Sequence, residues 1–216
     1  MLTYHRQAHL RQKKVSDIIP SKKLLIACGA LAKEINTLIT RNQWYTFDIT
    51  CLPAHFHNYP DRIVPQIQKK ISNAKLSGLY NEIIVVYGDC GTGGLLDKLL
   101  NKEKIKRISG NHCYEFYTGV TKFSNLAIEE IGTFYLSDYL VNFFDKLIIE
   151  GLGIQANPEL RDVYFKNYKR LVYLAQTKNS VLEEKAEYAA KTLGLKYIYK
   201  YTGYGDLSAF LKSKIN

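Results

Sequence analysis

Three of the four cysteines in this chain lie at or just beyond apolar runs typical of buried strands. Cys28 closes one such run, and Cys90 lies just after another, Ile83–Tyr87. Cys113 comes shortly after Ile108. Because the carboxyl ends of parallel strands meet at one edge of a sheet, we expect these three thiols to lie on the same rim. Thiolates are ligands for soft and borderline metals, so the spacing predicts a metal or thiolate site there.

Histidines lie near the same strand ends and are candidates for a fourth ligand. His55 and His57 are in the loop that follows the second expected strand, and His112 adjoins Cys113. If residues 111–113 are extended, neighbouring side chains point in opposite directions, so His112 and Cys113 are not expected to bind the same ion. The residues alone leave the fourth ligand open among the three histidines.

A glycine-rich turn, Gly88-Asp89-Cys90-Gly91-Thr92-Gly93-Gly94, follows the third strand. Glycines at this density allow positive φ angles and close approach of backbone N–H groups to a ligand, and the helix that follows favours an anion. The turn lacks the Walker A ending and the dinucleotide-binding spacing. It predicts either a cofactor-binding loop or a tight turn that carries a buried thiol. The residues of the cofactor-binding interpretation are Gly91, Thr92, Gly93 and Gly94.

Carboxylates near the rim are candidates for acid–base chemistry. Asp89 and Glu115 are the two that we assign to catalysis, and Asp138 is a further candidate. Acidic caps at helix starts account for Asp89 and Asp138 almost as well.

Apolar runs and helical spacings alternate along the chain about seven times. This pattern predicts an α/β fold, Rossmann-like, with about seven strands in a predominantly parallel sheet and helices on both faces. No linker composition interrupts residues 23–216, which we expect to form a single α/β domain. The expected strands are 23–27, 45–51, 82–87, 106–109, 133–136, 170–175 and 197–201.

The net charge of +10 is unevenly distributed. Residues 1–23 carry six Lys or Arg side chains against one acid, Asp17, and residues 1–22 are expected to form a flexible basic arm. Because nucleic-acid-binding motifs are missing, we interpret this arm as solvated rather than as a nucleic-acid contact. No signal peptide or membrane-length apolar run is present, which predicts a cytoplasmic protein with reduced thiols and no membrane partner.

Several segments together resemble a prokaryotic family of domains of unknown function, DUF1638. They are LPAHFHNYP, YGDCGTGGLLD, GNHCYEFYTG, GTFYLSDYLVNFFD and NPELRDVYFKNYKRLVYLAQ, and the resemblance extends from about Leu24 to Leu211. It implies that Cys28, His57, Cys90, His112, Cys113 and Glu115 are positions of the family's pattern, whereas Cys51 and His55 are not. The family implies no activity.

Three thiolates with one imidazole suit zinc, and we assign His57 to the metal. The resemblance keeps His57 and His112 and lowers the standing of His55, so the identity of the fourth ligand stays open. Such a site is expected in a metal-dependent enzyme, a transferase or lyase acting on a small molecule, for example by thiol activation or by alkyl or methyl transfer. A first alternative is a lyase with a [4Fe–4S] cluster on three cysteines and one open iron. A second is a non-catalytic accessory protein that binds a metal or a corrinoid. Neither the substrate nor the oligomeric state follows from the residues.

Overall fold

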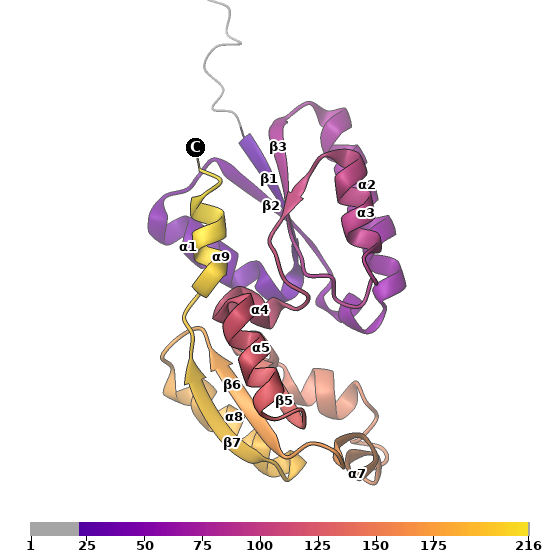
Figure 1. Ribbon diagram of the computed structural model, residues 1–216, viewed down its shortest axis with the longest axis vertical. Helices are drawn as coiled ribbons and strands as arrows, with labels where there is room; N and C mark the ends of the chain where they lie inside the picture. The colour runs from indigo at the N-terminus through magenta and orange to yellow at the C-terminus, as the bar shows by residue number, and fades with distance from the viewer. Residues whose placement is uncertain (1–21, 216) are drawn as a thin grey trace, which may run out of the picture.

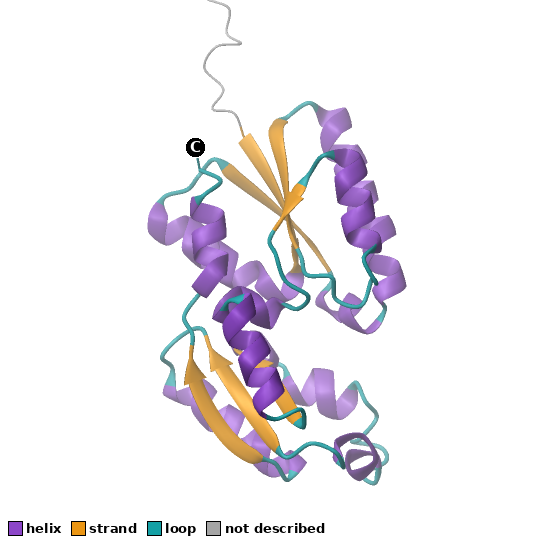
Figure 2. Ribbon diagram, in the orientation of Figure 1, coloured by secondary structure: helices purple, strands orange, loops and turns teal. Residues whose placement is uncertain are grey.

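The computed structural model describes residues 22–215, so the predicted basic arm lies outside the described residues except for Lys22. Within that range the chain is an α/β protein with seven strands, every one in parallel pairing, which confirms the predicted fold class. The strands form two sheets rather than the single sheet expected from the sequence (Figures 1 and 2). Their orders are β2-β1-β3-β4 and β5-β6-β7.

An apolar strand that is buried on both faces lies inside the first sheet. β1 has six consecutive buried residues, as parallel strands covered by helices require. Its register places Ala27 beside Cys51 of β2 and Val86 of β3, so the three strands end at one rim. The bounds are β1 Lys22–Cys28, β2 Phe47–Leu52, β3 Tyr80–Val86 and β4 Lys106–Arg107.

Helices pack on both sides of this sheet (Figure 1). On α2, Ile63, Ile67 and Ile71 form a buried stripe at helical spacing. The last helix, α9, crosses back from the second sheet and buries Leu207 and Leu211 in the core of the first. The bounds are α1 Ala32–Asn42, α2 Ile63–Ser77, α3 Leu95–Glu103 and α9 Gly205–Lys212.

The second sheet has its own core on each face. Phe123 of α5 packs against Val172 and Leu174 of the central strand, while Leu182 and Ala186 of α8 lie in the core on the other side. The strands are β5 Thr133–Ser137, β6 Arg170–Ala175 and β7 Lys196–Tyr201. The helices are α5 Val120–Glu129, α6 Asp138–Asn142, α7 Leu160–Phe165 and α8 Ser180–Leu193, with a π-helix over Asp145–Glu150.

The two sheets lie end to end, with the carboxyl ends of their strands directed toward the middle of the molecule (Figure 1). The loops that carry ligands in parallel α/β proteins therefore converge from both sheets on one region. Within residues 22–215, no helix combines the length and the apolar character needed to cross a membrane.

One local expectation was wrong. We expected the segment at His112 and Cys113 to be extended, but Cys113 is the first residue of a helix, α4 (Cys113–Thr118). His112, the residue that precedes the helix, is extended, at φ −134° and ψ 154°. Gly110 and Gly119, both at positive φ, bracket the segment and let it turn sharply at each end. The argument that His112 and Cys113 point to opposite sides of a strand therefore does not apply.

Candidate functional site

The three predicted cysteines lie together at the carboxyl rim of the first sheet. Cys28 ends β1, Cys90 is in the loop after β3, and Cys113 begins α4. Burial raises the pKa of Cys113 most, and the nearby Cys28 and Cys90 thiols raise it further. Burial followed by the Cys28 thiol likewise raises the pKa of Cys90 to about 12. These three thiols are close enough for Cys28 to raise the pKa of the other two, and we call them the thiol cluster. The Cys28 thiol also adds to the raised pKa of Cys51, on the neighbouring strand.

Two loops are joined edge to edge to bring Cys90 toward Cys113. The Cys90 amide donates to the Asn111 carbonyl at 2.9 Å, which continues the pairing of β3 and β4 beyond the strands. A Cβ atom at Gly88 would lie 2.8 Å from the same carbonyl oxygen, so only glycine allows this approach. Cys90 itself has φ 47°, a left-handed conformation that is uncommon for a residue with a side chain.

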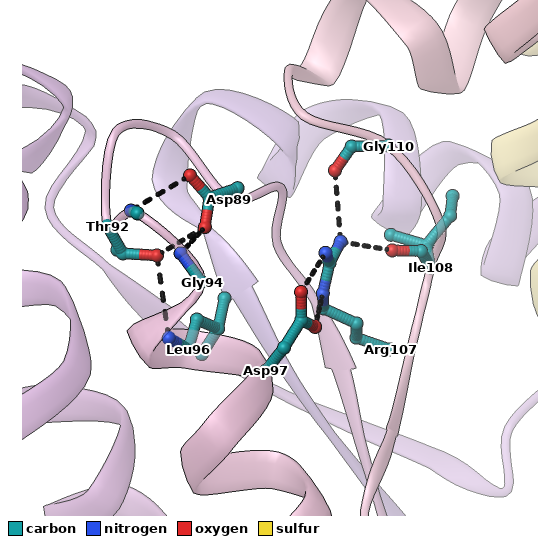
Figure 3. A network of polar contacts seen from close by, with 9 residues as sticks. Asp89, Thr92, Gly94, Leu96, Asp97, Arg107, Ile108 and Gly110 are labelled. Atoms are coloured by element: carbon teal, nitrogen blue, oxygen red, sulfur yellow. Dashed lines mark hydrogen bonds and ion pairs between the residues drawn. The ribbon is translucent and has the colours of Figure 1, made fainter.

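The Asp89 carboxylate closes the glycine-rich turn from inside (Figure 3). It accepts hydrogen bonds from Thr92 Oγ1 at 2.6 Å, Gly94 N at 2.8 Å and Gly93 N at 3.1 Å. Burial raises the pKa of Asp89, but the bonds from Thr92, Gly94 and Gly93 outweigh it and leave the pKa below its ordinary value. An anionic cofactor would have to compete with this carboxylate for the two glycine amides. These contacts indicate that Asp89 stabilises the turn.

Glu115, the other predicted catalytic carboxylate, is buried on the first turn of α4. Its Oε1 accepts a hydrogen bond from the Asn111 amide at 3.1 Å, an arrangement similar to a capping box. Because Asn111 also binds Cys90, Glu115 helps to fix the loop that positions two of the three thiols.

The histidines lie at the outside of the rim. His57 is in the 3₁₀ turn Ala54–Asn58 and is exposed, as is His112. Partial desolvation lowers the pKa of His57, and the proximity of His112 lowers it further, so the two imidazoles are near each other. His55 packs edge-on against Phe56. Across the described residues, no three or more His, Cys, Asp or Glu side chains already stand in an arrangement suited to a metal ion.

The structure adds Tyr87, which the sequence did not single out. Its side chain is 1% exposed, and burial followed by the Cys28 and Cys90 thiols raises its pKa far above the usual range. The contact of its hydroxyl with Cys28 falls short of a directed hydrogen bond, so this buried oxygen has no partner within residues 22–215. As the last residue of an apolar run, Tyr87 resembled an ordinary core residue.

A pocket of about 270 Å³ opens between the two sheets. One wall is Gly29, next to Cys28, and the first turn of α1; the other is α6, which follows β5. Burial raises the pKa of Tyr139, a lining residue, and the Cys28 thiol adds to this shift. A small molecule in the pocket would therefore lie close to Cys28.

Two buried carboxyl groups line the pocket and differ in how they are paired. Asp138 accepts hydrogen bonds from Tyr173 Oη, Gln176 N and both the amide and hydroxyl of Thr177, which ties the end of β5 to that of β6. Glu34 is 4% exposed, and its Oε2 is buried with no hydrogen-bond partner. A helical spacing of Leu31, Glu34, Ile35 and Leu38 places this acid on the apolar stripe of α1, which was the available signal for it.

Comparison with known proteins identifies the family to which the chain belongs. The sequence model of one family, described as a protein of unknown function (DUF1638), matches residues 51–211. The chain belongs to the DUF1638 family. Searches of curated proteins and of solved structures returned no match.

The DUF1638 match begins later than the resemblance in the sequence indicated, at Cys51 rather than near Leu24. It includes Cys90, Cys113 and the whole second sheet. Cys28 and Glu34, which approach the same region from β1 and α1, lie outside it.

Proposed function

We propose that this DUF1638 protein is a metal-dependent enzyme acting on a small molecule, with zinc held by Cys28, Cys90 and Cys113. The observation that carries the proposal is the convergence of three thiols, from three separate segments, beside a pocket between two sheets. Three cysteines buried only for packing need no such convergence.

The donor set suits zinc, although a rearrangement of the thiols would be needed to bind it. The three thiols are protonated at neutral pH and must lose protons to bind a metal. The unpaired Tyr87 hydroxyl fits this change, because a thiolate sulfur accepts a stronger hydrogen bond than a neutral thiol does. His57 is the proposed fourth ligand, and its neutral imidazole is the form that binds metal.

A zinc–thiolate centre, when present, lowers the pKa of a bound substrate thiol and prepares it for alkyl or methyl transfer. The residues of this chain would contribute the surroundings. Tyr87 would donate a hydrogen bond to a sulfur, Glu115 would hold the loop of Cys113 in place, and the pocket would exclude bulk water from the substrate.

A [4Fe–4S] cluster is the second candidate, favoured by the exposure of His57 and His112. Three cysteines with no protein ligand on the fourth iron would leave that iron open for a substrate. A protein that carries a metal or corrinoid without turnover is the remaining alternative.

Metal analysis of anaerobically purified protein tests the proposal. We expect about one zinc per chain in the natural protein and a sharp loss in Cys28→Ser, Cys90→Ser and Cys113→Ser. Cys51→Ser is the matched control, since Cys51 is half-buried in β2 beside the same rim and is not a proposed ligand. Absorption near ~400 nm would favour the iron–sulfur cluster. Metal-free natural protein after reconstitution, or equal loss in all four variants, would overturn the metal site.

A further inference from the structure

The pocket between the sheets has one chemically unusual feature, the free oxygen of Glu34. Within residues 22–215 only Oε2 of this carboxyl lacks a partner, and a buried carboxylate oxygen without a donor is costly because it has lost its hydrogen bonds to water. Glu34 is one of two buried acids that line the pocket, and the other, Asp138, is saturated with four hydrogen bonds. Of the two acids, only Glu34 has a carboxylate oxygen that lacks a hydrogen-bond donor in the described part of the chain.

The other lining groups indicate what kind of donor would fit. Tyr139 and Phe143 of α6 stack in a tilted pair with ring centroids 4.9 Å apart, and both line the pocket. The side-chain amide of Asn142 lies in the same wall and can accept a hydrogen bond. Lys33 also lines the pocket, but it is exposed and Glu34 Oε2 receives no hydrogen bond from it. The carboxylate, the amide oxygen and the two aromatic rings together favour a positively charged hydrogen-bond donor over an anion.

We infer that this pocket binds a small molecule through a protonated primary amine, with Glu34 as the counter-ion and Tyr139 and Phe143 against its apolar part. The volume of about 270 Å³ is near the lower end for ligand pockets, which limits the ligand to a small metabolite. The inference names a substrate class for the proposed enzyme. It rests on the proposed function only in calling the ligand a substrate. Binding of the amine itself requires no metal.

A second hollow of about 360 Å³, at the ends of β6 and β7, supports no comparable inference. Its cationic residues, Lys122 and Lys200, are exposed, and within the described chain no buried polar atom without a partner lines it.

The test is a titration of the full chain, metal-free and zinc-loaded, with n-butylamine at pH 7. n-Butanol and butyrate serve as neutral and anionic probes of matched size. Amide chemical shifts of Gly29 and Asn142 should move with the amine at concentrations where the two other probes have little effect. Equal binding of n-butanol, or no shift at these residues with any probe, would overturn the inference.

Substitutions test whether Glu34 is the residue that binds the amine. Glu34→Gln keeps the side-chain volume and should weaken amine binding at least tenfold, whereas Glu184→Gln, an exposed acid on α8, should leave it unchanged. Unchanged binding in Glu34→Gln would contradict the assignment. Phe143→Ala provides a second variant at a half-exposed ring and should weaken binding even if Glu34→Gln proves unstable.

The experiments can refute the metal site and the amine site independently of each other. If Glu34→Gln loses the amine and keeps its zinc, the pocket is confirmed independently. If the cysteine variants keep their zinc while the amine still binds, the proposed metal site is wrong and the pocket stands.

Discussion

Arg107 of β4 and Asp97 of α3 form a bidentate ion pair, with Nε–Oδ1 at 2.5 Å and Nη2–Oδ2 at 2.8 Å (Figure 3). The remaining guanidinium nitrogen, Nη1, donates to the carbonyls of Ile108 and Gly110, each at 2.9 Å. Arg107 is mostly buried, whereas the Asp97 side chain is 48% exposed. The arginine thus fastens the loop that leads to Cys113 onto the helix that follows the glycine-rich turn.

Arg107→Ala is expected to loosen this loop more than Asp97→Asn does. Removing the guanidinium leaves the Ile108 carbonyl without its donor and the Gly110 carbonyl with only the long bond from the Asp89 amide at 3.4 Å. A buried unsatisfied group costs about 1–3 kcal/mol. Loss of the exposed Asp97 carboxylate should lower the free energy of unfolding by ~1 kcal/mol or less, because solvent screens its charge. Urea unfolding and amide exchange at Cys90 and Asn111 measure both effects. Lys75→Ala, which breaks an exposed ion pair with Glu103, is the control and should change neither by much.

The same ion pair predicts a pH effect with a definite sign. The hydrogen bond from Arg107 lowers the pKa of Asp97, so the folded state binds a proton less readily than the unfolded state. The stability from this group is present above the ordinary pKa of an aspartate and is lost as pH falls through the folded-state pKa. Natural protein and Asp97→Asn should therefore converge in stability at low pH. A difference that persists unchanged at the most acidic pH would contradict this.

Asp89→Ala should destabilise the glycine-rich turn without removing metal. The carboxylate satisfies two backbone amides and a hydroxyl, much as an N-cap residue does, and loss of such a cap costs about 0.5–2 kcal/mol. The freed amides of Gly93 and Gly94 should then bind inorganic phosphate, which the natural protein is expected to bind less well. Thermal unfolding with and without phosphate measures this. Loss of metal in folded Asp89→Ala would show instead that Asp89 acts at the metal site.

The strands and the rim of cysteines could be predicted because both depend on local sequence. Continuous apolar runs indicate buried parallel strands, and a residue at the end of such a run lies at the rim whichever strands are neighbours. The division into two sheets could not be predicted, since no change of composition marks it. It depends on β4, which has only two residues and ends the first sheet before β5 begins the second.

Tyr87 and Glu34 were missed for different physical reasons. A tyrosine after four apolar residues is most often core, and its unpaired hydroxyl becomes visible only when the three thiols are placed around it. An acid in a helix usually faces water, and the burial of Glu34 depends on α6, which comes from the other sheet. The helical spacing of Leu31, Glu34 and Leu38 indicates a buried position, but which element covers it depends on long-range packing between the sheets.

Glu34→Gln should stabilise the ligand-free protein at neutral pH. Burial and the nearby Asp138 raise the pKa of Glu34, and its own backbone and Lys33 act against them without outweighing them, so the folded state favours the protonated carboxyl. That stability is present below the ordinary glutamate pKa and is lost as pH rises through the folded-state pKa, by ~1.4 kcal/mol for each unit of difference. Glutamine cannot ionise. The advantage of the variant should therefore grow between pH 4 and 8, as measured by thermal unfolding, with Glu184→Gln as a flat control.

Asp138→Asn is expected to have the opposite effect and to destabilise the protein. Its carboxylate accepts from Tyr173, from the Gln176 amide and from the amide and hydroxyl of Thr177, with all of these at the buried ends of β5 and β6. An asparagine offers one acceptor oxygen, and its NH₂ group would face donors, leaving at least one buried N–H unsatisfied at about 1–3 kcal/mol.

Paired unfolding curves for Glu34→Gln and Asp138→Asn at pH 7 compare two acids that line one pocket. We expect the first variant to unfold at higher and the second at lower urea concentration than the natural protein. The opposite signs would follow from the different pairing of the two carboxyl groups, since both side chains are almost inaccessible to water. If both variants lose stability, Glu34 has a donor in the folded protein, and the free oxygen on which the amine pocket depends would not exist.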